Sequence, residues 1–329
     1  MDGYILGIDG GGTGTKAVLL RGKEICHSLE TGTINLNGAP EEVVTENIRT
    51  LLRRALSLAG QDGPADGSVR AVGLAGAGVS NPGERMLLAS CVREFIPGPD
   101  SLVIAGDDES ALEGAFSGGD GIVLIAGTGS VCRGKRSMPD GTFRSLRSGG
   151  FGHLIDDGGS AYAIGRAILS SVVHSIDGRG PETLLTKLVR SRLDAGDDDL
   201  VPAIISHVYR PGAPKSEIAG FAMLLETACA EGDAEALRIA DEASEELCGL
   251  VRAVYRRLYV PDAGDEAPAE TEAAAVALMG SVLTQNLRIR TAVTAKLGRA
   301  LPCLMVTAPE HDAAYGAALL AGRRAQSGT

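Results

Sequence analysis

Tryptophan is absent from this sequence, and other aromatic residues are scarce. Aromatic side chains account for 3% of the 329 residues, whereas apolar side chains account for 44%. Alanine, valine, leucine and isoleucine must therefore build the interior, and a chain of this length suffices for two domains of ordinary size or one large domain. Glycine is frequent, with 45 residues. The glycines cluster in motifs, which indicates tight turns and close backbone approaches rather than a flexible linker.

Closely spaced cysteines are also missing. The six cysteines lie far apart in the sequence, and no CxxC or cysteine–histidine pattern of a zinc site occurs. The start of the sequence lacks the basic and apolar regions of a signal peptide, and no apolar run approaches the ~18–20 residues that span a membrane. We therefore expect a cytoplasmic protein with reduced thiols and no membrane partner.

Positive charge is in deficit, since the net charge at pH 7 is −11. A strongly acidic protein repels the phosphate backbone of nucleic acids, so we expect no nucleic-acid partner. A nucleotide such as ATP is also an anion. A site for it would therefore need backbone amides and a bound divalent cation to offset the overall charge.

Apolar periodicity predicts strands and helices in alternation along most of the chain. The predicted strands span residues 4–8, 15–20, 25–29, 69–75, 101–105, 122–126, 131–134, 273–279 and 303–307. The predicted helices span residues 40–60, 85–95, 109–115, 284–297 and 312–324, and residues 160–258 are predicted to be mostly helical. The first three strands are joined by short turns and should form an antiparallel meander.

A glycine cluster joins the first two predicted strands at residues 10–14. Residues 12–17 match a lax dinucleotide-binding fingerprint, but that motif requires a following helix, whereas residues 15–20 favour a strand. No P-loop motif occurs either. Asp9 ends the first strand, where a carboxylate can hold hydrated Mg²⁺. The bare amides of residues 11–13 can approach phosphate without obstruction by a Cβ atom.

A strand, a turn of glycine, threonine and serine, and a second strand recur once in each half, at residues 4–20 and 122–134. Together with the segment 276–281 and the predicted helices after residues 107 and 312, these motifs resemble the five nucleotide-binding segments of the actin/hexokinase/heat-shock-ATPase superfamily, in the same order. The resemblance implies an α/β fold of two ribonuclease H-like (actin-like ATPase) domains that face a central cleft, with helical additions in the second. The predicted domains comprise residues 1–116 with 311–329, and residues 117–310.

Residues 149–162 make the resemblance more specific. They are similar to the Gly-Trp-Gly-His-x-x-Gly-Asp-Glu-Gly-Ser-Ala-Tyr segment of N-acetylglucosamine kinases in the BadF/BadG/BcrA/BcrD ATPase family. Phe151 replaces the tryptophan, Asp156 replaces a glycine and Gly158 replaces the glutamate. The last of these departures bears on the choice of sugar.

The resemblance implies a role for individual residues. Asp107 matches the catalytic base that accepts the proton of the sugar primary hydroxyl, with Asp108 as a rival for that role or as a helix N-cap. Asp9 would hold the magnesium ion. The implied ATP-binding residues are Gly11, Gly12, Thr13, Lys16, Gly127, Thr128, Gly129, Gly280 and Ser281. The implied substrate-binding residues are Asn35, Gly76, Asp107, Gly150, Asp157 and Ala161.

Several of these assignments have alternatives. Asn37 competes with Asn35, and either can be an ordinary turn residue. Asp157 can instead be the N-cap of the helix that begins near Ser160. Lys16 either neutralises phosphate or points outward from its strand. His153 is expected to pack the loop rather than act as a base.

The implied activity is phosphoryl transfer from ATP, with Mg²⁺, to N-acetylglucosamine to give the 6-phosphate. Glucosamine, N-acetylmuramate and glucose are alternative acceptors, and a homodimer is the expected assembly. A second function within the same family is an ATPase that activates an iron–sulfur dehydratase, which would need closely placed cysteines. A third is a sugar-sensing or cytoskeletal protein of the same fold.

Overall fold

The computed structural model describes residues 3–11, 14–36, 39–62, 69–76, 81–96, 98, 101–196, 199–260 and 273–327. The chain forms two compact units, which we call unit 1 (Met1–Asp120 with Ala308–Thr329) and unit 2 (Gly121–Thr307). The domain boundaries predicted from the sequence, residues 1–116 with 311–329 and residues 117–310, stay a prediction. None of the helices within the described ranges is long and apolar enough to cross a membrane.

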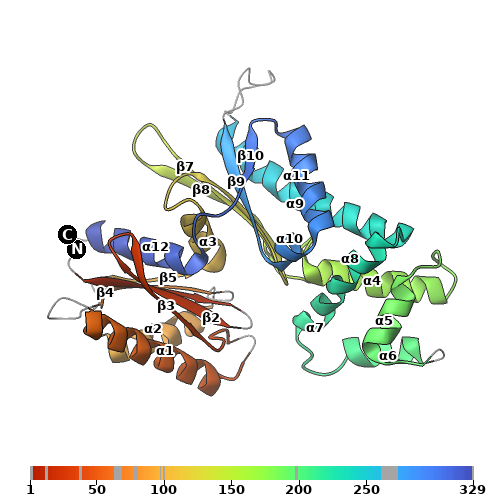
Figure 1. Ribbon diagram of the computed structural model, residues 1–329, viewed down its shortest axis with the longest axis horizontal. Coiled ribbons are helices and arrows are strands. Elements are labelled where there is room, and N and C mark those ends of the chain that lie inside the picture. Colours follow the sequence, from red (N-terminus) through yellow and green to blue (C-terminus); the bar gives the residue numbers. More distant parts are fainter. Residues whose placement is uncertain are drawn as a thin grey trace. The chain divides into compact units, whose positions relative to one another are not determined.

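Unit 1 contains a five-stranded sheet of order β3-β2-β1-β4-β5. Its strands are β1 (Tyr4–Gly10), β2 (Thr15–Arg21), β3 (Glu24–Thr31), β4 (Val69–Gly76) and β5 (Ser101–Gly106). The first three form the predicted antiparallel meander, whereas β4 and β5 run parallel to β1. Helices α1 (Glu41–Asp62) and α2 (Pro82–Phe95) cover one face, and α12 (Ala313–Ser327) covers the other beside α3 (Asp107–Ala115) (Figure 1).

Strand β1 is buried on both faces because helices pack on each side of the sheet. Tyr4, Leu6 and Ile8 pack into the core formed with α1 and α2, whereas Ile5 packs into the core formed with α12. Successive side chains of a strand point to opposite faces. Asp9 therefore shares the α12 face with Ile5, and this alternation decides which elements surround its carboxylate.

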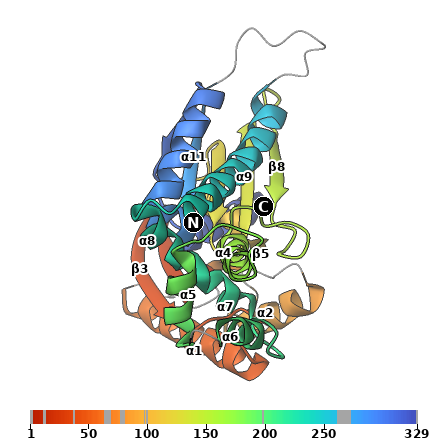
Figure 2. The same cartoon turned by 90° about the vertical axis from the view of Figure 1, so that its right-hand side faces the viewer.

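Unit 2 contains a second five-stranded sheet, of order β10-β9-β6-β7-β8. Its strands are β6 (Gly121–Ala126), β7 (Ser130–Ser137), β8 (Phe143–Gly149), β9 (Ala274–Met279) and β10 (Leu304–Thr307). Helices α9 (Ala234–Tyr259) and α11 (Leu287–Ala300) lie side by side along this sheet and share its apolar core (Figure 2).

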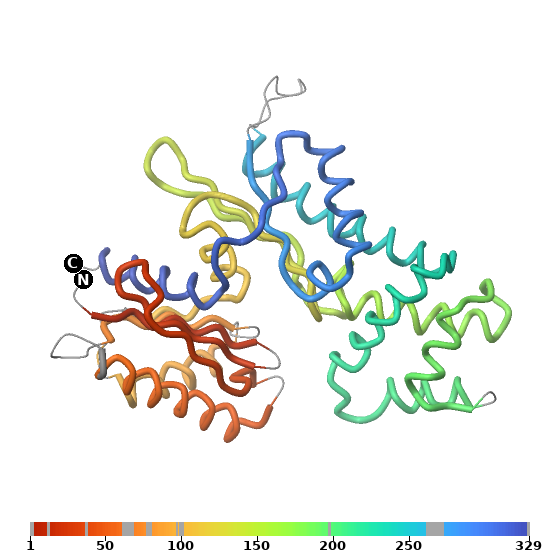
Figure 3. The backbone as a smooth tube through the Cα atoms, viewed as in Figure 1, coloured from red at the N-terminus to blue at the C-terminus, as the bar shows by residue number. Residues whose placement is uncertain are grey.

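The helices before α9 belong to the region that the sequence predicts to be mostly helical, residues 160–258. They are α4 (Ala161–Ile176), α5 (Leu185–Leu193), α6 (Leu200–Val208), α7 (Lys215–Ala219), a 3-10 helix (Gly220–Met223) and α8 (Leu224–Ala230), whereas α10 (Ser281–Gln285) follows β9. The tube in Figure 3 shows that the chain from α5 to α7 leads away from the sheet of this unit. Gly165 of α4 lies directly against the Ile218 backbone of α7, which joins this layer to α4.

Two elements differ from the prediction. Strand β8 was not predicted, because its residues include two arginines and it lies at the sheet edge with most side chains partly or fully exposed. The helix predicted over residues 284–297 is instead two helices, α10 and α11. Asn286 separates them, since its side chain accepts a hydrogen bond from the Ile289 amide at 2.9 Å and caps α11.

Helix α12 packs unusually close to the sheet of unit 1 because two strand positions lack side chains. A Cβ atom at Gly7 would overlap the carbonyl oxygen of Ala314, and one at Gly73 would overlap that of Ala317. These glycines are partners in the β1–β4 register. The helix backbone therefore rests directly on the sheet backbone.

We predict that Gly73→Ala destabilises the protein, since the added methyl group forces α12 away from the sheet. The expected loss in the free energy of unfolding is about 1–3 kcal/mol, as for other overpacked cores. Urea unfolding of the wild type and the variant measures it. Gly60→Ala is the matched control, because a Cβ atom there meets nothing within 4 Å; it should leave stability unchanged or raise it by up to about 1 kcal/mol. Equal stability of Gly73→Ala and the wild type would contradict the packing described.

Candidate active site

Three glycines lie side by side where the parallel strands of unit 1 end. Gly10, Gly76 and Gly106 are register partners across β1, β4 and β5. Asp9 precedes the first of them, and Asp107 follows the last as the first residue of α3. The carboxyl ends of parallel strands are the usual place for ligands in α/β sheets. Because glycine has no side chain, this edge leaves room for a ligand between the flanking polar residues.

The carboxylate of Asp9 lies in an acidic environment within unit 1. Burial of its side chain, followed by the neighbouring carboxylates of Asp107 and Asp312, raises the pKa of Asp9 from 3.8 to about 6. Lys16 opposes this shift. Lys16 is exposed and is the cross-strand partner of Asp9, so its ammonium lies on the same face of the sheet.

This arrangement fits a cation that is held mainly through water. Within the described ranges no group of three or more histidine, cysteine or acidic side chains is close enough to ligate a metal ion directly. Magnesium commonly keeps several water ligands and is bound by one or two carboxylates together with substrate phosphates. Asp9, with the charge of Asp107 and Asp312 nearby, suits that mode of binding.

The structure distinguishes Asp107 from its neighbour Asp108. Asp107 is half-buried and lies close enough to raise the pKa of Asp9, whereas Asp108 is only 4% exposed. Asp107 Oδ1 also accepts a hydrogen bond from the Asp108 amide at 2.9 Å. The N-cap of α3 is Gly106, without a side-chain bond, so the interpretation of Asp108 as the helix cap is wrong.

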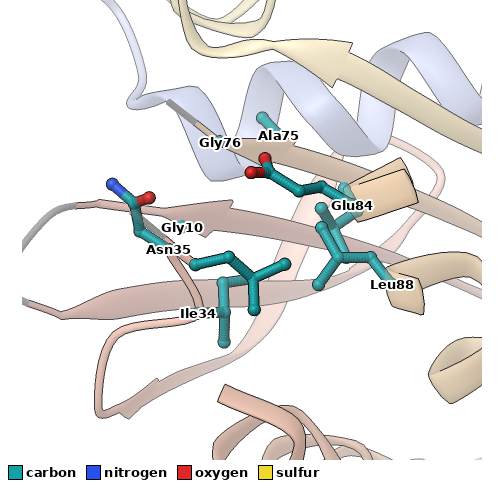
Figure 4. Close-up of a pocket in the computed structure, with 9 residues that line it drawn as sticks. Gly10, Ile34, Asn35, Ala75, Gly76, Glu84 and Leu88 are labelled. Carbon is teal, nitrogen blue, oxygen red and sulfur yellow. The ribbon is translucent and has the colours of Figure 1, made fainter. Parts of the chain in front are cut away.

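A hollow opens on the α2 side of the same sheet edge (Figure 4). Gly10, Ile34, Asn35, Leu36, Leu74, Ala75, Gly76, Glu84 and Leu88 line it. Two predicted substrate-binding residues, Asn35 and Gly76, thus meet at one place. Asn47 fixes the loop before Asn35, because its amide donates a hydrogen bond to the Thr33 carbonyl at 2.8 Å.

Two polar residues of this region, Glu84 and Asp312, were not among the predicted site residues. Glu84 stands three residues after Asn81, which caps α2 by accepting a hydrogen bond from the Gly83 amide. An asparagine followed three residues later by glutamate is a known signal for a helix start, yet the predicted helix began at Arg85. Asp312 Oδ1 accepts a hydrogen bond from the Tyr315 amide at 3.2 Å and so caps α12.

Gly12, Thr13 and Asn37, which have predicted roles, lie outside the described residues. Gly11 is described, and its amide donates a hydrogen bond to the Gly14 carbonyl at 2.9 Å. The roles of Gly12, Thr13 and Asn37 stay predictions.

The second glycine turn, residues 127–130, is held in place within unit 2 by the start of α4. The Gly127 amide donates a hydrogen bond to the Gly129 carbonyl at 2.9 Å, as Gly11 does to Gly14 in the first turn. The Ala161 amide in turn donates to the Gly127 carbonyl at 2.8 Å, and the Tyr162 amide donates to the Thr128 carbonyl at 3.3 Å. A sugar contact by Ala161 would therefore involve its side chain rather than its amide.

Asp157 lies against this same turn. It is 3% exposed and adopts a left-handed backbone conformation with φ of 66°. Its Oδ1 accepts a hydrogen bond from the Ser130 amide at 3.4 Å, and its carboxylate borders Gly129. The interpretation of Asp157 as a helix cap is wrong, because Ser160 caps α4 by accepting from the Ala163 amide.

The loop between β8 and α4 holds Gly150 in a left-handed conformation, with φ of 76°. The Gly150 carbonyl accepts a hydrogen bond from Arg147 Nη2 at 2.7 Å. His153 packs edge-on against Tyr162, with ring centroids 4.7 Å apart, as a residue that packs the loop should. Phe151, at the position of the family tryptophan, is 66% exposed.

Gly280 lies beside the second turn at the end of β9. It has φ of 88°, and a Cβ atom there would overlap the Ala126 backbone, which immediately precedes Gly127. Ser281 follows as the exposed first residue of α10. Gly129 is part of this turn, and three other predicted residues of unit 2 therefore lie around it: Asp157, Ala161 and Gly280. How they meet the residues of unit 1 stays a prediction.

A family of known ATPases matches almost the whole chain. The model of the BadF/BadG/BcrA/BcrD ATPase family matches residues 6–321. An N-acetylmuramic acid/N-acetylglucosamine kinase of Clostridium acetobutylicum is 29% identical over 97% of this chain and 98% of its own length. An N-acetyl-D-glucosamine kinase of Dictyostelium discoideum is 29% identical over 77% of this chain and 79% of its own length.

A solved structure shows the same fold. A candidate N-acetylglucosamine kinase from Chromobacterium violaceum has a TM-score of 0.70 at 26% identity, over 97% of this chain and 99% of that one. The predicted fold class is therefore confirmed as the two-domain actin-like (ribonuclease H-like) ATPase fold, with two mixed five-stranded sheets and flanking helices.

We predict that Asp9→Asn stabilises the protein near neutral pH. Between pH 3.8 and about 6 the folded chain keeps a proton on Asp9 that the unfolded chain releases, so the free energy of unfolding falls as the pH rises through this window. The amide side chain of Asp9→Asn does not titrate in this range, so the variant does not undergo this decrease in the free energy of unfolding. The free energy of unfolding should rise by about 1–3 kcal/mol at about pH 7.5 and change little below about pH 4.

Urea unfolding at both pH values, with EDTA present, measures this effect. Asp140→Asn is the control of opposite sign, because hydrogen bonds from Thr142 lower the pKa of Asp140. It should cost stability above pH 3.8 rather than add it. An Asp9→Asn variant that is less stable than the wild type at about pH 7.5 would contradict the raised pKa of Asp9.

Proposed function

Because this chain belongs to the BadF/BadG/BcrA/BcrD ATPase family, we propose that it is an ATP-dependent kinase of an amino sugar. The proposed reaction converts N-acetylglucosamine into its 6-phosphate. Membership of the family implies that the chain binds ATP. One relative described above is named an N-acetylmuramic acid/N-acetylglucosamine kinase and the other an N-acetyl-D-glucosamine kinase, and both names support an amino sugar as the acceptor.

The observation that carries the proposal is the position of Asp107 at the open glycine edge of unit 1. It begins α3 immediately after Gly106, beside the carboxylate of Asp9 and at the same edge as the hollow of Asn35 and Gly76. A base for a hydroxyl group, a carboxylate for a cation and a recess for a sugar are the parts that a sugar kinase requires. All three are properties of one unit of the chain.

In the proposed reaction the 6-hydroxyl oxygen of the sugar forms a bond to the γ-phosphorus of ATP. The bond from that phosphorus to the β,γ-bridging oxygen breaks, and ADP leaves. Asp107 accepts the hydroxyl proton, and Asn35 with Gly76 orients the sugar. Mg²⁺, when bound near Asp9, neutralises phosphate charge.

The two glycine turns serve the phosphates in this proposal. Backbone amides of residues 11–13 and of Gly127 to Gly129 are the donors, with Thr128 and Lys16 as supporting side chains. Gly280 and Ser281 would border the adenosine. Gly150, Asp157 and Ala161 of unit 2 are further substrate-binding residues in this proposal, and a homodimer remains the expected assembly.

We predict that sugars stimulate ADP release by the purified protein. A coupled ADP assay with N-acetylglucosamine, glucosamine, N-acetylmuramate and glucose tests this, with magnesium present. N-acetylglucosamine should give the highest kcat/KM, and the product should be the 6-phosphate by NMR. If none of these sugars increases ADP release above the rate with ATP alone, the proposed function is wrong.

We predict that Asp107→Asn loses most turnover yet keeps its ligands, because the amide cannot accept the hydroxyl proton. The expected decrease in kcat is about 10²–10⁴-fold. Calorimetric titration should show nearly unchanged affinity for ATP and sugar. Asp108→Asn is the matched comparison, and a larger loss of kcat in that variant would transfer the role of base to Asp108.

A further inference from the structure

One carboxylate in the hollow of unit 1 has no role in the proposed mechanism. Glu84 lies in the first turn of α2 and lines the hollow together with Asn35, Gly76 and Gly10. In Figure 4 the Glu84 carboxylate and the Asn35 amide lie on the same side as Gly76, beyond the apolar side chains of Ile34 and Leu88. The two oxygens of the Glu84 carboxylate therefore face the space that the proposed sugar would occupy.

The start of α2 does not use the hydrogen-bonding capacity of the Glu84 carboxylate. Asn81 already caps α2 through the Gly83 amide, and the neighbouring Arg85 bonds to the Ile104 carbonyl rather than to Glu84. Across the part of the chain that the structure describes, the Glu84 carboxylate has no hydrogen bond or ion pair. A half-buried carboxylate without a partner gains most from a ligand that donates hydrogen bonds.

The charge around the hollow restricts which ligand that is. Asp9, Asp107 and Asp312 lie close together at the ends of the strands that border the hollow, although none of them lines it, and the whole chain carries a net charge of −11. A ligand with a carboxylate of its own would be repelled by Glu84 and by this cluster. A neutral sugar, by contrast, offers hydroxyl donors and no repulsion.

We propose that Glu84 is a specificity-determining residue that accepts hydrogen bonds from the hydroxyl groups of a neutral sugar and excludes sugars that carry a carboxylate. The inference rests on the proposed function, since it places the sugar in this hollow. It separates acceptors such as N-acetylglucosamine from N-acetylmuramate, which differs by an acidic lactyl ether. Discrimination of this kind uses an unfavourable interaction with the wrong ligand as well as a favourable one with the right ligand.

Glu84→Gln tests the proposal because it keeps the size of the side chain and removes the charge. KM for N-acetylglucosamine should rise about tenfold or more, as expected for a lost charged hydrogen bond, while kcat changes less than about threefold. The ratio of kcat/KM for N-acetylmuramate to that for N-acetylglucosamine should rise at least about tenfold. Glu84→Asp, which keeps the charge, should preserve the discrimination better than Glu84→Gln.

Glu41→Gln is the matched control. Glu41 also lies in the first turn of a helix of unit 1, is exposed and does not line the hollow. A carboxylate at a helix start favours helix stability, and this control reports any general effect of removing one. Its KM values and its sugar ratio should equal those of the wild type, and both variants should melt near the wild-type temperature.

The outcomes separate this inference from the proposed function. Wild-type turnover of N-acetylglucosamine with unchanged KM and unchanged sugar ratio in Glu84→Gln overturns the role of Glu84 alone. Calorimetric binding of N-acetylglucosamine that weakens in Glu84→Gln, without turnover by the wild type, overturns only the proposed reaction. A wild type that neither binds nor phosphorylates any of the sugars overturns both.

Discussion

The contact between α12 and the sheet of unit 1 is the constraint on which the candidate site depends. Gly7 and Gly73 allow the helix backbone to rest on the strands, and a side chain at either position would overlap a helix carbonyl. The first turn of α12 is thereby held beside the start of α3, where Gly316 of α12 lies directly against the Ser110 backbone. Asp312 and Asp107 reach Asp9 as a consequence, and their charges add to the effect of burial, the larger cause, in raising the pKa of Asp9.

The same local structure, a glycine-rich turn after a strand, occurs in both units, although its surroundings differ. In each, a strand ends in a glycine-rich turn closed by one short hydrogen bond, from Gly11 to Gly14 and from Gly127 to Gly129. In unit 2 the start of α4 binds the carbonyls of that turn and Asp157 lies beneath it, so the turn is fixed by its neighbours. A turn of this kind can present amides to an anion without reorganising.

The sequence contained enough to predict most strands and helices, because apolar alternation and glycine positions follow directly from the layers of the fold. Asn35 and Gly76 were both predicted to bind substrate, and in the structure they line one hollow. Strand β8 escaped prediction because an exposed edge strand with arginines carries no apolar signal. Glu84 was not predicted as a site residue because its relevance comes from the packing of α2 against the strand ends, which no local sequence pattern specifies.

The interpretation of Asp157 and Asp108 as helix caps was wrong for a related reason. Any aspartate near a helix start satisfies the sequence rule, but only the residue with the right backbone geometry can be the cap. Ser160 has extended geometry and binds the Ala163 amide, whereas Asp157 is left-handed and faces the turn. The choice between candidates one to three residues apart is thus made by dihedral angles that the sequence does not specify.

The position of α12 in the chain also bears on how the protein is made. Unit 1 starts with β1 at Tyr4, yet the helix that covers one face of its sheet begins only at Ala313, after the whole of unit 2. During synthesis on the ribosome, Ile5, Val18 and Leu20 must therefore wait for their covering helix while unit 2 is translated and can fold. A nascent chain that is halted before Ala313 exposes this apolar face and is a natural substrate for chaperones.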